Sequence, residues 1–509
     1  MLNFYTKQEA AALIPDGAVV GVNNFLALCQ PAAIHEGITD SFLRSGHPRD
    51  LTLICTGGFG NWREDTLAEP YVAAGAVRRV IASHYGSMPV TTRRALNNEI
   101  EAYCLPLGAI SHGIRAGAGG LPGCLSQVGL GIFVDPRIHG AALNQRSKEE
   151  FISLLELDGE EYLYYRIPRL DVALIKATSL DANGNLSFEN EFITADALSC
   201  AQNAKANGGL VIAQVDRVSS LSTRPRNVIV PGFLVDAVVV EEPEDHTTAY
   251  SAMNGDFHAP PLHLKYWMDR LNRERGGEQD NSGQRHIIGR RACAELKAGD
   301  VVNIGIGIPE LVGIYAAKND ILEDLTLTVE AGGVGGLPAA GELFGATIGA
   351  DMVSDIATQF DFYDGGGLSV CFMGALEVDR YGNVNAHSLP GQFSGIGGFA
   401  NVTHATKKVV FCLTFRTGGL KASLLDDATV RIDTEGEQAK FRARINSISF
   451  SAANALKKGQ QVLYVTERCV FELTAAGLKL IEVYPGIDRQ RQILDLLEFP
   501  VIVDGSAGV

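Results

Sequence analysis

Residues 325–338 read LTLTVEAGGVGGLP, an apolar run that ends in Glu330 and continues into a loop with four glycines. The run Leu325–Val329 lacks strict alternation, which is typical of a strand buried on both faces of a sheet. A side chain at the carboxyl end of a parallel strand points toward the crevice where open α/β sheets bind ligands. The stretch therefore predicts an α/β sheet with a carboxylate at its ligand-binding edge.

Similar apolar runs recur throughout the chain and alternate with helix-like stretches, a pattern that predicts α/β domains with mostly parallel sheets. In the first half they span residues 18–21, 51–55, 172–176, 210–214 and 237–240. In the second half they span residues 301–306, 325–329, 409–413 and 461–465.

An internal repeat indicates that the two halves share one design. The matching pairs are 16–21 (DGAVVG) with 299–305 (GDVVNIG), 51–53 with 325–327 (both LTL), 116–122 (AGAGGLP) with 331–338 (AGGVGGLP), and 181–186 (DANGNL) with 379–384 (DRYGNV). The glycine loops pair Glu330 with Arg115, whereas the LTL runs pair it with Thr56. Neither register gives the first half a carboxylate, so we expect one half to hold the reactive group and the other to shape the pocket.

The most polar stretch, RLNRERGGEQDNSGQR at residues 270–285, has almost nothing to bury and is typical of a linker. We therefore expect a first domain at 1–270, a linker at 271–285 and a second domain at 286–509. A chain of 509 residues also exceeds what one hydrophobic core usually supports.

Composition excludes several classes of function. The net charge is −16 and the basic residues form no long run, which argues against nucleic-acid binding. The sequence contains no apolar stretch of about 18 residues, so we expect no membrane span. Its start lacks the pattern of a secretory signal. The nine cysteines are scattered singly, which disfavours zinc sites and disulfides and fits a reducing cytoplasm. The eleven histidines show no paired ligand spacing, so we expect no metal.

Glu330 is the candidate nucleophile, provided that the fold removes part of its hydration and fixes its orientation. The glycines beside it, including Gly332 and Gly333, would leave N–H groups facing developing oxyanions. The same pattern is also typical of a solvated glutamate beside a structural turn.

Two further glycine loops could contact a ligand. Gly305 and Gly307 follow a predicted strand, but Glu310 stands where a dinucleotide fingerprint needs its last glycine. A strand-to-helix turn with Pro309 near the helix start fits better. Residues 395–399 (GIGGF) form the other loop, with Gly395, Gly397 and Gly398. Plain packing turns remain the alternative for both.

The chain resembles the class I CoA-transferase family, of the single-chain acetate/propionate CoA-transferase type related to 3-oxoacid CoA-transferase. The resemblance covers nearly the whole chain. Its most specific segments are 329–338, 359–368 (QFDFYDGGGL), 379–383 and 466–471 (TERCVF), with 115–122 and 128–137 (VGLGIFVDPR) in the first half. It implies a duplicated α/β CoA-transferase fold.

The resemblance implies that Glu330 is the catalytic residue of a ping-pong transfer of CoA from a short-chain acyl-CoA to a small carboxylate, through a glutamyl-CoA thioester. It further implies that no metal or organic cofactor is needed and that the chain assembles as a homodimer or homotetramer. The implied substrate, CoA and oxyanion region comprises Gly305, Gly307, Gly332, Gly333, Gly395, Gly397, Gly398, Asn24, Phe25, Gly119 and Gly120.

The chain departs from the family pattern at two places. The early loop reads GVNNFLAL at 21–28, with two asparagines that bear on acyl-group selection, and Ala331 replaces the Ser or Asn that commonly follows the glutamate. An acyl-CoA hydrolase on the same fold is the leading alternative function. A noncatalytic acyl-CoA-binding protein is a third.

Overall fold

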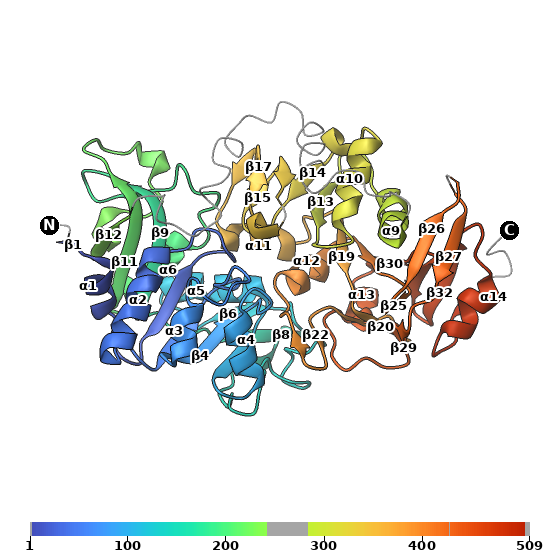
Figure 1. Cartoon of the computed structure of the whole chain (residues 1–509), viewed down its shortest axis with the longest axis horizontal. Coiled ribbons are helices and arrows are strands. Elements are labelled where there is room, and N and C mark those ends of the chain that lie inside the picture. The colour runs from blue at the N-terminus through green and yellow to red at the C-terminus, as the bar shows by residue number, and fades with distance from the viewer. Residues whose placement is uncertain (1–2, 242–282, 340, 427, 504–509) are drawn as a thin grey trace.

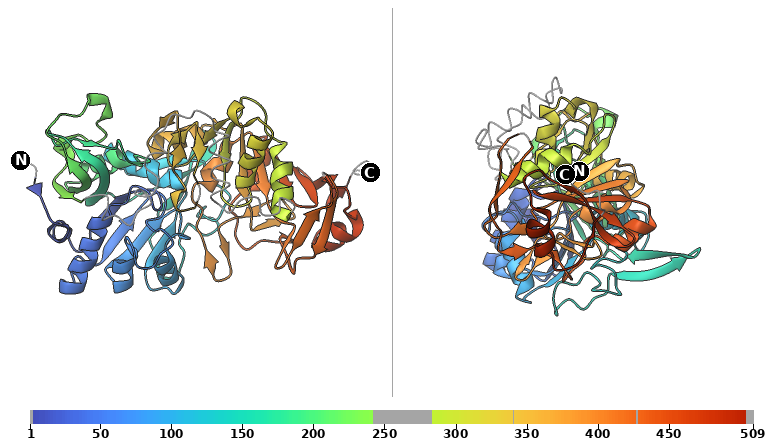
Figure 2. Two further views of the ribbon diagram at one scale, coloured as in Figure 1. Left: turned by 45° about the horizontal axis from the view of Figure 1, so that its top comes forward. Right: turned by 90° about the vertical axis from the view of Figure 1, so that its right-hand side faces the viewer.

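The two halves of the chain lie side by side along the longest axis of the molecule (Figure 1). The computed structural model describes residues 3–241, 283–339, 341–426 and 428–503. The blue start of the first half and the red end of the second lie at opposite ends of this axis, as the left view of Figure 2 also shows. This arrangement brings one flank of each half together at the centre.

The first half is built on a sheet whose main path is parallel throughout, in the order β1-β12-β11-β9-β2-β3-β4-β5. Every residue of β9 is buried, as expected for a central strand covered on both faces. The strands are β1 (Asn3–Phe4), β2 (Val19–Asn23), β3 (Leu51–Ile54), β4 (Val77–Ala82), β5 (Glu101–Cys104), β9 (Val172–Leu180), β11 (Leu210–Val218) and β12 (Ala237–Val240), with β10 (Leu186–Ser187) antiparallel to β9. A separate sheet contains β6 (Cys124–Ser126), β7 (Ile152–Leu157) and β8 (Glu160–Tyr165).

The second half has a parallel centre with antiparallel additions at both edges, in the order β18-β15-β14-β13-β19-β24-β30-β31-β32-β33. These strands are β13 (Val301–Ile304), β14 (Thr326–Thr328), β15 (Gly333–Val334), β18 (Met352–Val353), β19 (Val370–Gly374), β24 (Lys408–Cys412), β30 (Gln461–Val465), β31 (Cys469–Thr474), β32 (Gly477–Val483) and β33 (Ile502–Val503). The short strand pairs outside it are β16 (Leu337–Pro338) with β17 (Thr347–Ile348), β22 (Ser388–Leu389) with β23 (Gln392–Phe393), β25 (Arg416–Thr417) with β28 (Gln438–Ala439), and β26 (Lys421–Leu424) with β27 (Val430–Thr434). A further three-stranded sheet contains β20 (Glu377–Asp379), β21 (Val384–Asn385) and β29 (Phe441–Arg442).

Helices connect the strands in both halves. The first half has α1 (Lys7–Ala12), α2 (Ala32–Ser45), α3 (Glu69–Ala74), α4 (Pro89–Leu96), α5 (Leu107–Ala118) and α6 (Ala197–Ala206). The second half has α9 (Gln284–Cys293), α10 (Glu310–Lys318), α11 (Ile356–Asp364), α12 (Phe399–Ala405), α13 (Ala452–Lys457) and α14 (Arg489–Gln492). All nine predicted strands are present, and the prediction of two similar, mostly parallel α/β domains is confirmed.

The duplication is visible in the strand order. The path β12-β11-β9-β2-β3 of the first half corresponds to β30-β24-β19-β13-β14 of the second, and all neighbours in both paths are parallel. The DANGNL and DRYGNV turns also share their hydrogen bonds. Asp181 Oδ1 accepts from the backbone N–H groups two and four residues later, and Asp379 Oδ1 does the same.

One of the four repeat matches is wrong. Residues 116–122 include the end of helix α5 and the turn after it, whereas residues 331–338 form a tight loop with the short strands β15 and β16. The LTL match holds, because β3 and β14 occupy the same place beside β2 and β13. Thr56, not Arg115, is therefore the counterpart of Glu330.

The predicted linker lies largely outside the described residues, which omit 242–282 and with them the last part of the predicted first domain. Helix α9 begins at Gln284, with Gly283 as its N-cap. The second half thus starts two residues inside the predicted linker.

Candidate active site

A cavity of about 400 Å³ lies between the two halves. Its walls come from residues just past the carboxyl ends of strands in both sheets: Gly57 after β3, His84 after β4, Gly305 after β13 and Glu330 after β14. This is the edge at which α/β sheets bind ligands. The remaining lining residues are Phe25, Leu26, Leu107, Ile306, Ile308, Phe344, Met373, Gly374, Ala375, Leu376, Ala386, Ser394, Gly395, Ile396, Gly397, Gly398, Phe399 and Cys412.

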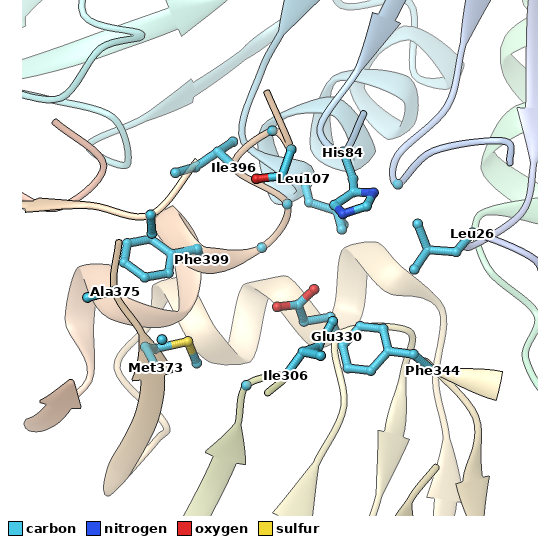
Figure 3. A pocket seen from close by; sticks show the side chains of 18 of the residues that line it. Leu26, His84, Leu107, Ile306, Glu330, Phe344, Met373, Ala375, Ile396 and Phe399 are labelled. Carbon is cyan, nitrogen blue, oxygen red and sulfur yellow. The ribbon is translucent and has the colours of Figure 1, made fainter. Parts of the chain in front are cut away.

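Glu330 directs its carboxylate into this cavity (Figure 3). The residue is partly buried, and burial raises the pKa of its carboxyl from the ordinary value to about 7, while a hydrogen bond from the backbone of Gly398 acts in the opposite direction. A carboxylate that has lost part of its hydration is a stronger nucleophile than one in bulk water. The solvated strand-end glutamate that the sequence also allowed is not what the structure shows.

The loop 394–398 belongs to the second half but is held by the first. The backbone N–H groups of Tyr85 and Gly86 donate to Ser394 O at 2.8 and 3.0 Å, and the Gly397 N–H donates to Ser83 O at 2.9 Å. Leu107 N–H in turn donates to Gly397 O at 3.0 Å. The first half therefore sets the position of the glycines that face Glu330, as the repeat led us to expect.

Gly332 and Gly333 shape the turn behind Glu330 and do not line the cavity. A Cβ on Gly332 would lie 2.0 Å from Ser354 O, and one on Gly333 would lie 2.1 Å from Thr347 Oγ1. Both positions exclude a side chain, so these glycines let the chain turn sharply after β14. Gly332 also donates its N–H to Val329 O at 3.0 Å, which closes the turn that contains Glu330.

The Gly305–Gly307 turn joins β13 to α10, as the sequence predicts, with Pro309 at the helix start. Gly305 lines the cavity, together with Ile306 and Ile308. Gly307 has a φ of 90° and donates its N–H to Glu310 Oε1 at 3.0 Å, so its role is in the turn itself.

The early loop contributes one of its two predicted residues to the lining. Phe25 lines the cavity, whereas Asn24 is buried beneath it. The Asn24 amide donates to Leu26 O at 3.0 Å and to Gly58 O at 2.6 Å. Asn24 therefore fixes the path of the loop that carries Phe25 and Leu26.

Gly119 and Gly120 do not reach the cavity. Both are exposed at the end of helix α5, where Gly120 has a φ of 77°. A positive φ after a helix is a common reason for glycine, and this local role applies to Gly120, whereas Gly119 is the C-cap of the helix with a φ of −84°.

His84 is an ionisable lining residue that sequence reasoning missed. It follows β4 in the first half and lies across the cavity from Glu330 (Figure 3). The available signal was its place directly after a buried strand, which is the rule that identified Glu330. The histidines that lie closest to the glycine loops in sequence have other partners: His387 contacts Ser449, and His404 contacts Lys458.

Most of the lining is apolar. Glu330 and His84 are the ionisable acid and imidazole among its side chains, and the described lining contains no lysine or arginine. Within the described ranges no group of three or more His, Cys, Asp or Glu side chains is placed to hold a metal ion. Among the same residues no helix is long and apolar enough to cross a membrane. All nine cysteines are free, and eight are buried.

Comparison with known proteins decides the family. A family model described as Coenzyme A transferase matches residues 5–241 and 287–491, one segment in each half. The chain belongs to the coenzyme A transferase family. The resemblance found in the sequence is thereby confirmed, and the protein is a CoA-transferase.

Relatives within the CoA-transferase family extend over the whole chain. Acetate CoA-transferase YdiF of Escherichia coli K12 is 38% identical over 511 residues, which cover 98% of this chain and 92% of that protein. Caffeate CoA-transferase of Acetobacterium woodii is 37% identical over 508 residues, covering 98% of this chain and 94% of that one. The crystal structure of acyl-CoA transferase YdiF from E. coli O157:H7, as a thioester complex with CoA, superposes with a TM-score of 0.88 at 35% identity, covering 99% of this chain and 94% of that one.

Proposed function

We propose that this CoA-transferase moves CoA from a short-chain acyl-CoA to an acceptor carboxylic acid by a ping-pong mechanism, through a glutamyl-CoA thioester on Glu330. The observation that carries the proposal is the position of the Glu330 carboxylate. It is partly desolvated, lies in a cavity between the halves, and is bonded by the Gly398 N–H. Most of the cavity lining is apolar, which suits a thioester and an acid with an apolar tail.

In the first half-reaction a Glu330 oxygen attacks the carbonyl carbon of the acyl-CoA. A C–O bond forms and the C–S bond breaks, so that CoA leaves as a thiolate with the electron pair and an acyl-glutamyl anhydride remains. The thiolate then attacks the Glu330 carbonyl carbon of the anhydride. A C–S bond forms, a C–O bond breaks, and the first acid leaves as a carboxylate.

In the second half-reaction an acceptor carboxylate attacks the glutamyl-CoA thioester and repeats these steps in reverse order. No redox change and no net proton transfer occurs, so the chemistry requires no metal or organic cofactor. Each attack passes through a tetrahedral oxyanion, which backbone N–H groups of the surrounding glycine loops are suited to stabilise.

The relatives support this assignment. YdiF is named an acetate CoA-transferase, and its crystal structure is described as a thioester complex with CoA. The Acetobacterium protein is named a caffeate CoA-transferase, so acids of different size occur as substrates among relatives of similar identity. We therefore propose a small monocarboxylate as substrate without naming one acid.

Replacement of the nucleophile tests the proposal. Glu330→Gln should lower acyl-CoA:carboxylate exchange by at least about 1,000-fold, because an amide cannot form the covalent intermediate. The control is Glu323→Gln, an exposed glutamate before β14, which should retain wild-type exchange. Exchange that survives in Glu330→Gln would contradict the proposal.

The same assay separates transfer from hydrolysis. A transferase releases almost no free CoA thiol with or without an acceptor acid, because the thiolate is recaptured on Glu330 and CoA then leaves on the acceptor as a new acyl-CoA. Continuous thiol release without any acceptor, as the dominant reaction, would instead assign acyl-CoA hydrolysis to this site.

We also propose a cytoplasmic homodimer or homotetramer. The free, mostly buried thiols support a reducing compartment. Light scattering coupled to size-exclusion chromatography measures the assembly, and a monomeric mass at micromolar concentration would contradict it.

A further inference from the structure

His84, a half-buried residue, differs from the buried histidines of the described chain. His35 has a hydrogen-bond partner at each ring nitrogen, Tyr71 and Gln30, and His387 has Ser449 and Ser447. The Nδ1 atom of His84 is buried and has no hydrogen-bond partner among the described residues. An unsatisfied buried polar atom costs free energy, so its retention at a site calls for a functional reason.

Backbone contacts hold the main chain of His84 in place. The His84 N–H donates to Gly57 O at 3.3 Å, and His84 pairs with Gly395 in an isolated antiparallel bridge between the halves. The ring lies beside Gly86, where an added Cβ would be 3.1 Å from His84 Cε1 and 3.2 Å from Nε2. His84 is therefore held at the junction of the two halves, on the cavity wall that faces Glu330 (Figure 3).

The chemistry at Glu330 needs a donor on that wall. When an acceptor acid approaches the glutamyl-CoA thioester, its carboxylate must enter an apolar space with no lysine or arginine in the described lining. A desolvated carboxylate without a donor is costly. The Gly398 N–H already serves the Glu330 side chain, and the Gly397 N–H serves Ser83 O.

An imidazole suits this task in its neutral form. Burial lowers the pKa of His84 to about 4, so the ring is uncharged at neutral pH. One nitrogen then carries a proton that can be donated, and the ring does not form a fixed ion pair with Glu330 that would quench the nucleophile.

We propose that His84 donates a hydrogen bond to an oxygen of the substrate carboxylate, or of the thioester carbonyl derived from it, and so holds the reacting carbon opposite Glu330. This inference rests on the proposed function and adds to it a substrate-binding residue from the first half. His84 contacts the substrate directly and takes part in no covalent step.

The test compares three variants in two assays. His84→Leu removes the donor at similar volume, His84→Gln keeps an N–H donor that can reach into the cavity, and His139→Leu is a control at an exposed histidine. The first assay measures kcat and KM for the acceptor acid. The second measures binding of free CoA, which the proposed contact does not involve.

We expect His84→Leu to lower kcat/KM for the acid by about 10–100-fold, the range for losing a hydrogen bond to a charged group. His84→Gln should restore at least half of that loss on a logarithmic scale, and free CoA should bind all variants alike. Wild-type kcat/KM in His84→Leu would overturn the proposal. Equal loss in the Leu and Gln variants, with a lowered Tm in both, would overturn it in favour of a structural role.

Two further outcomes are separated in advance. If His84→Leu does not fold, His84→Asn and His84→Gln decide the matter, because the longer amide must be the more active by several-fold, and equal activity overturns the proposal. If wild-type Glu330 never acquires CoA, the proposed function fails, and this result is independent of every His84 variant.

Discussion

Gly398 lies directly against the Glu330 carboxylate: a Cβ atom on Gly398 would be 2.5 Å from Glu330 Cδ and 2.7 and 2.8 Å from its two oxygens. The Gly398 backbone also hydrogen-bonds this carboxylate. One glycine thus both leaves room for the Glu330 carboxylate and hydrogen-bonds it. The position of this glycine depends on the first half, through the neighbouring Gly397 N–H that donates to Ser83 O.

Gly398→Ala should therefore impair catalysis without straining the backbone. Gly398 has a φ of −85°, which alanine adopts readily, so the added methyl group acts only on Glu330. A displacement of about 1 Å at a reacting group can cost about 100-fold in rate, and we expect at least that loss in formation of the glutamyl-CoA thioester.

The matched control is Gly119→Ala. Gly119 has a φ of −84°, and its added Cβ would meet only Ala116 O, at 3.5 Å. Wild-type activity in this variant would also agree with the position of Gly119 outside the cavity. Equal activity of Gly398→Ala and Gly119→Ala would show that the contact with Glu330 has no role.

The pH dependence of acylation should report the Glu330 carboxyl. Because burial raises its pKa to about 7, the carboxylate is the minor form below that pH and the major form above it. The single-turnover rate of thioester formation should rise from pH 5.5 to 8.5 with a midpoint near 7. A flat profile over this range would mean that Glu330 titrates at its ordinary value.

The contribution of Glu330 to the free energy of unfolding should fall as pH rises, whereas the acylation rate rises. The folded state holds the Glu330 proton more tightly than the unfolded state, so this group lowers the free energy of unfolding as pH rises from 4.5 to about 7. Glu330→Gln removes the effect, and its Tm should exceed that of wild type by about 2–5 °C at pH 8. The difference should shrink at pH 5.5, and a difference that grows there would refute the sign.

Butyrate and succinate form a matched pair of acceptors, since they share their chain length and differ by a second carboxylate. The described lining offers that second charge no lysine or arginine. A desolvated charge without a partner costs several kcal/mol, so kcat/KM for succinate should be at least about 100-fold below that for butyrate. Competition of both acids for one acyl-CoA, read by mass spectrometry, measures the ratio, and equal use would place a cation at the site.

The contact between the loop 394–398 and the first half can be tested at Gly395. Its φ is 84°, and an added Cβ would lie 2.4 Å from Ser83 O. Gly395→Ala should lower both Tm and activity, because the loop cannot stay on the first half. Gly391→Ala provides the control, since Gly391 has a φ of 76° but no atom within 4 Å of an added Cβ. Any excess loss in Gly395→Ala reports the docking contact, and equal losses would assign the effect to backbone strain alone.

The sequence predicts the strands and the nucleophile because both depend on local pattern. Continuous apolar runs mark buried parallel strands, and a carboxylate directly after such a run, at Glu330, is placed at the ligand-binding edge by the geometry of the sheet. The DANGNL and DRYGNV repeats are equally local, since one Asp and one glycine define each turn.

Features that depend on contacts between distant parts of the chain are not predicted by local pattern. The AGAGGLP match pairs the end of a helix with a loop, because glycine-rich strings satisfy helix ends and tight turns alike. Placing Gly119 and Gly120 in the site followed from that string and from the resemblance. His84 was missed although it too follows a buried strand, because its importance arises only when the other half is docked opposite.

The measurement that bears most directly on the account is peptide mapping by mass spectrometry after the enzyme has been mixed with acyl-CoA alone. The account predicts that CoA mass is added to the peptide that contains Glu330, that borohydride abolishes this adduct, and that an acceptor acid discharges it. A CoA adduct on another residue, or none while exchange proceeds, would contradict the role of Glu330.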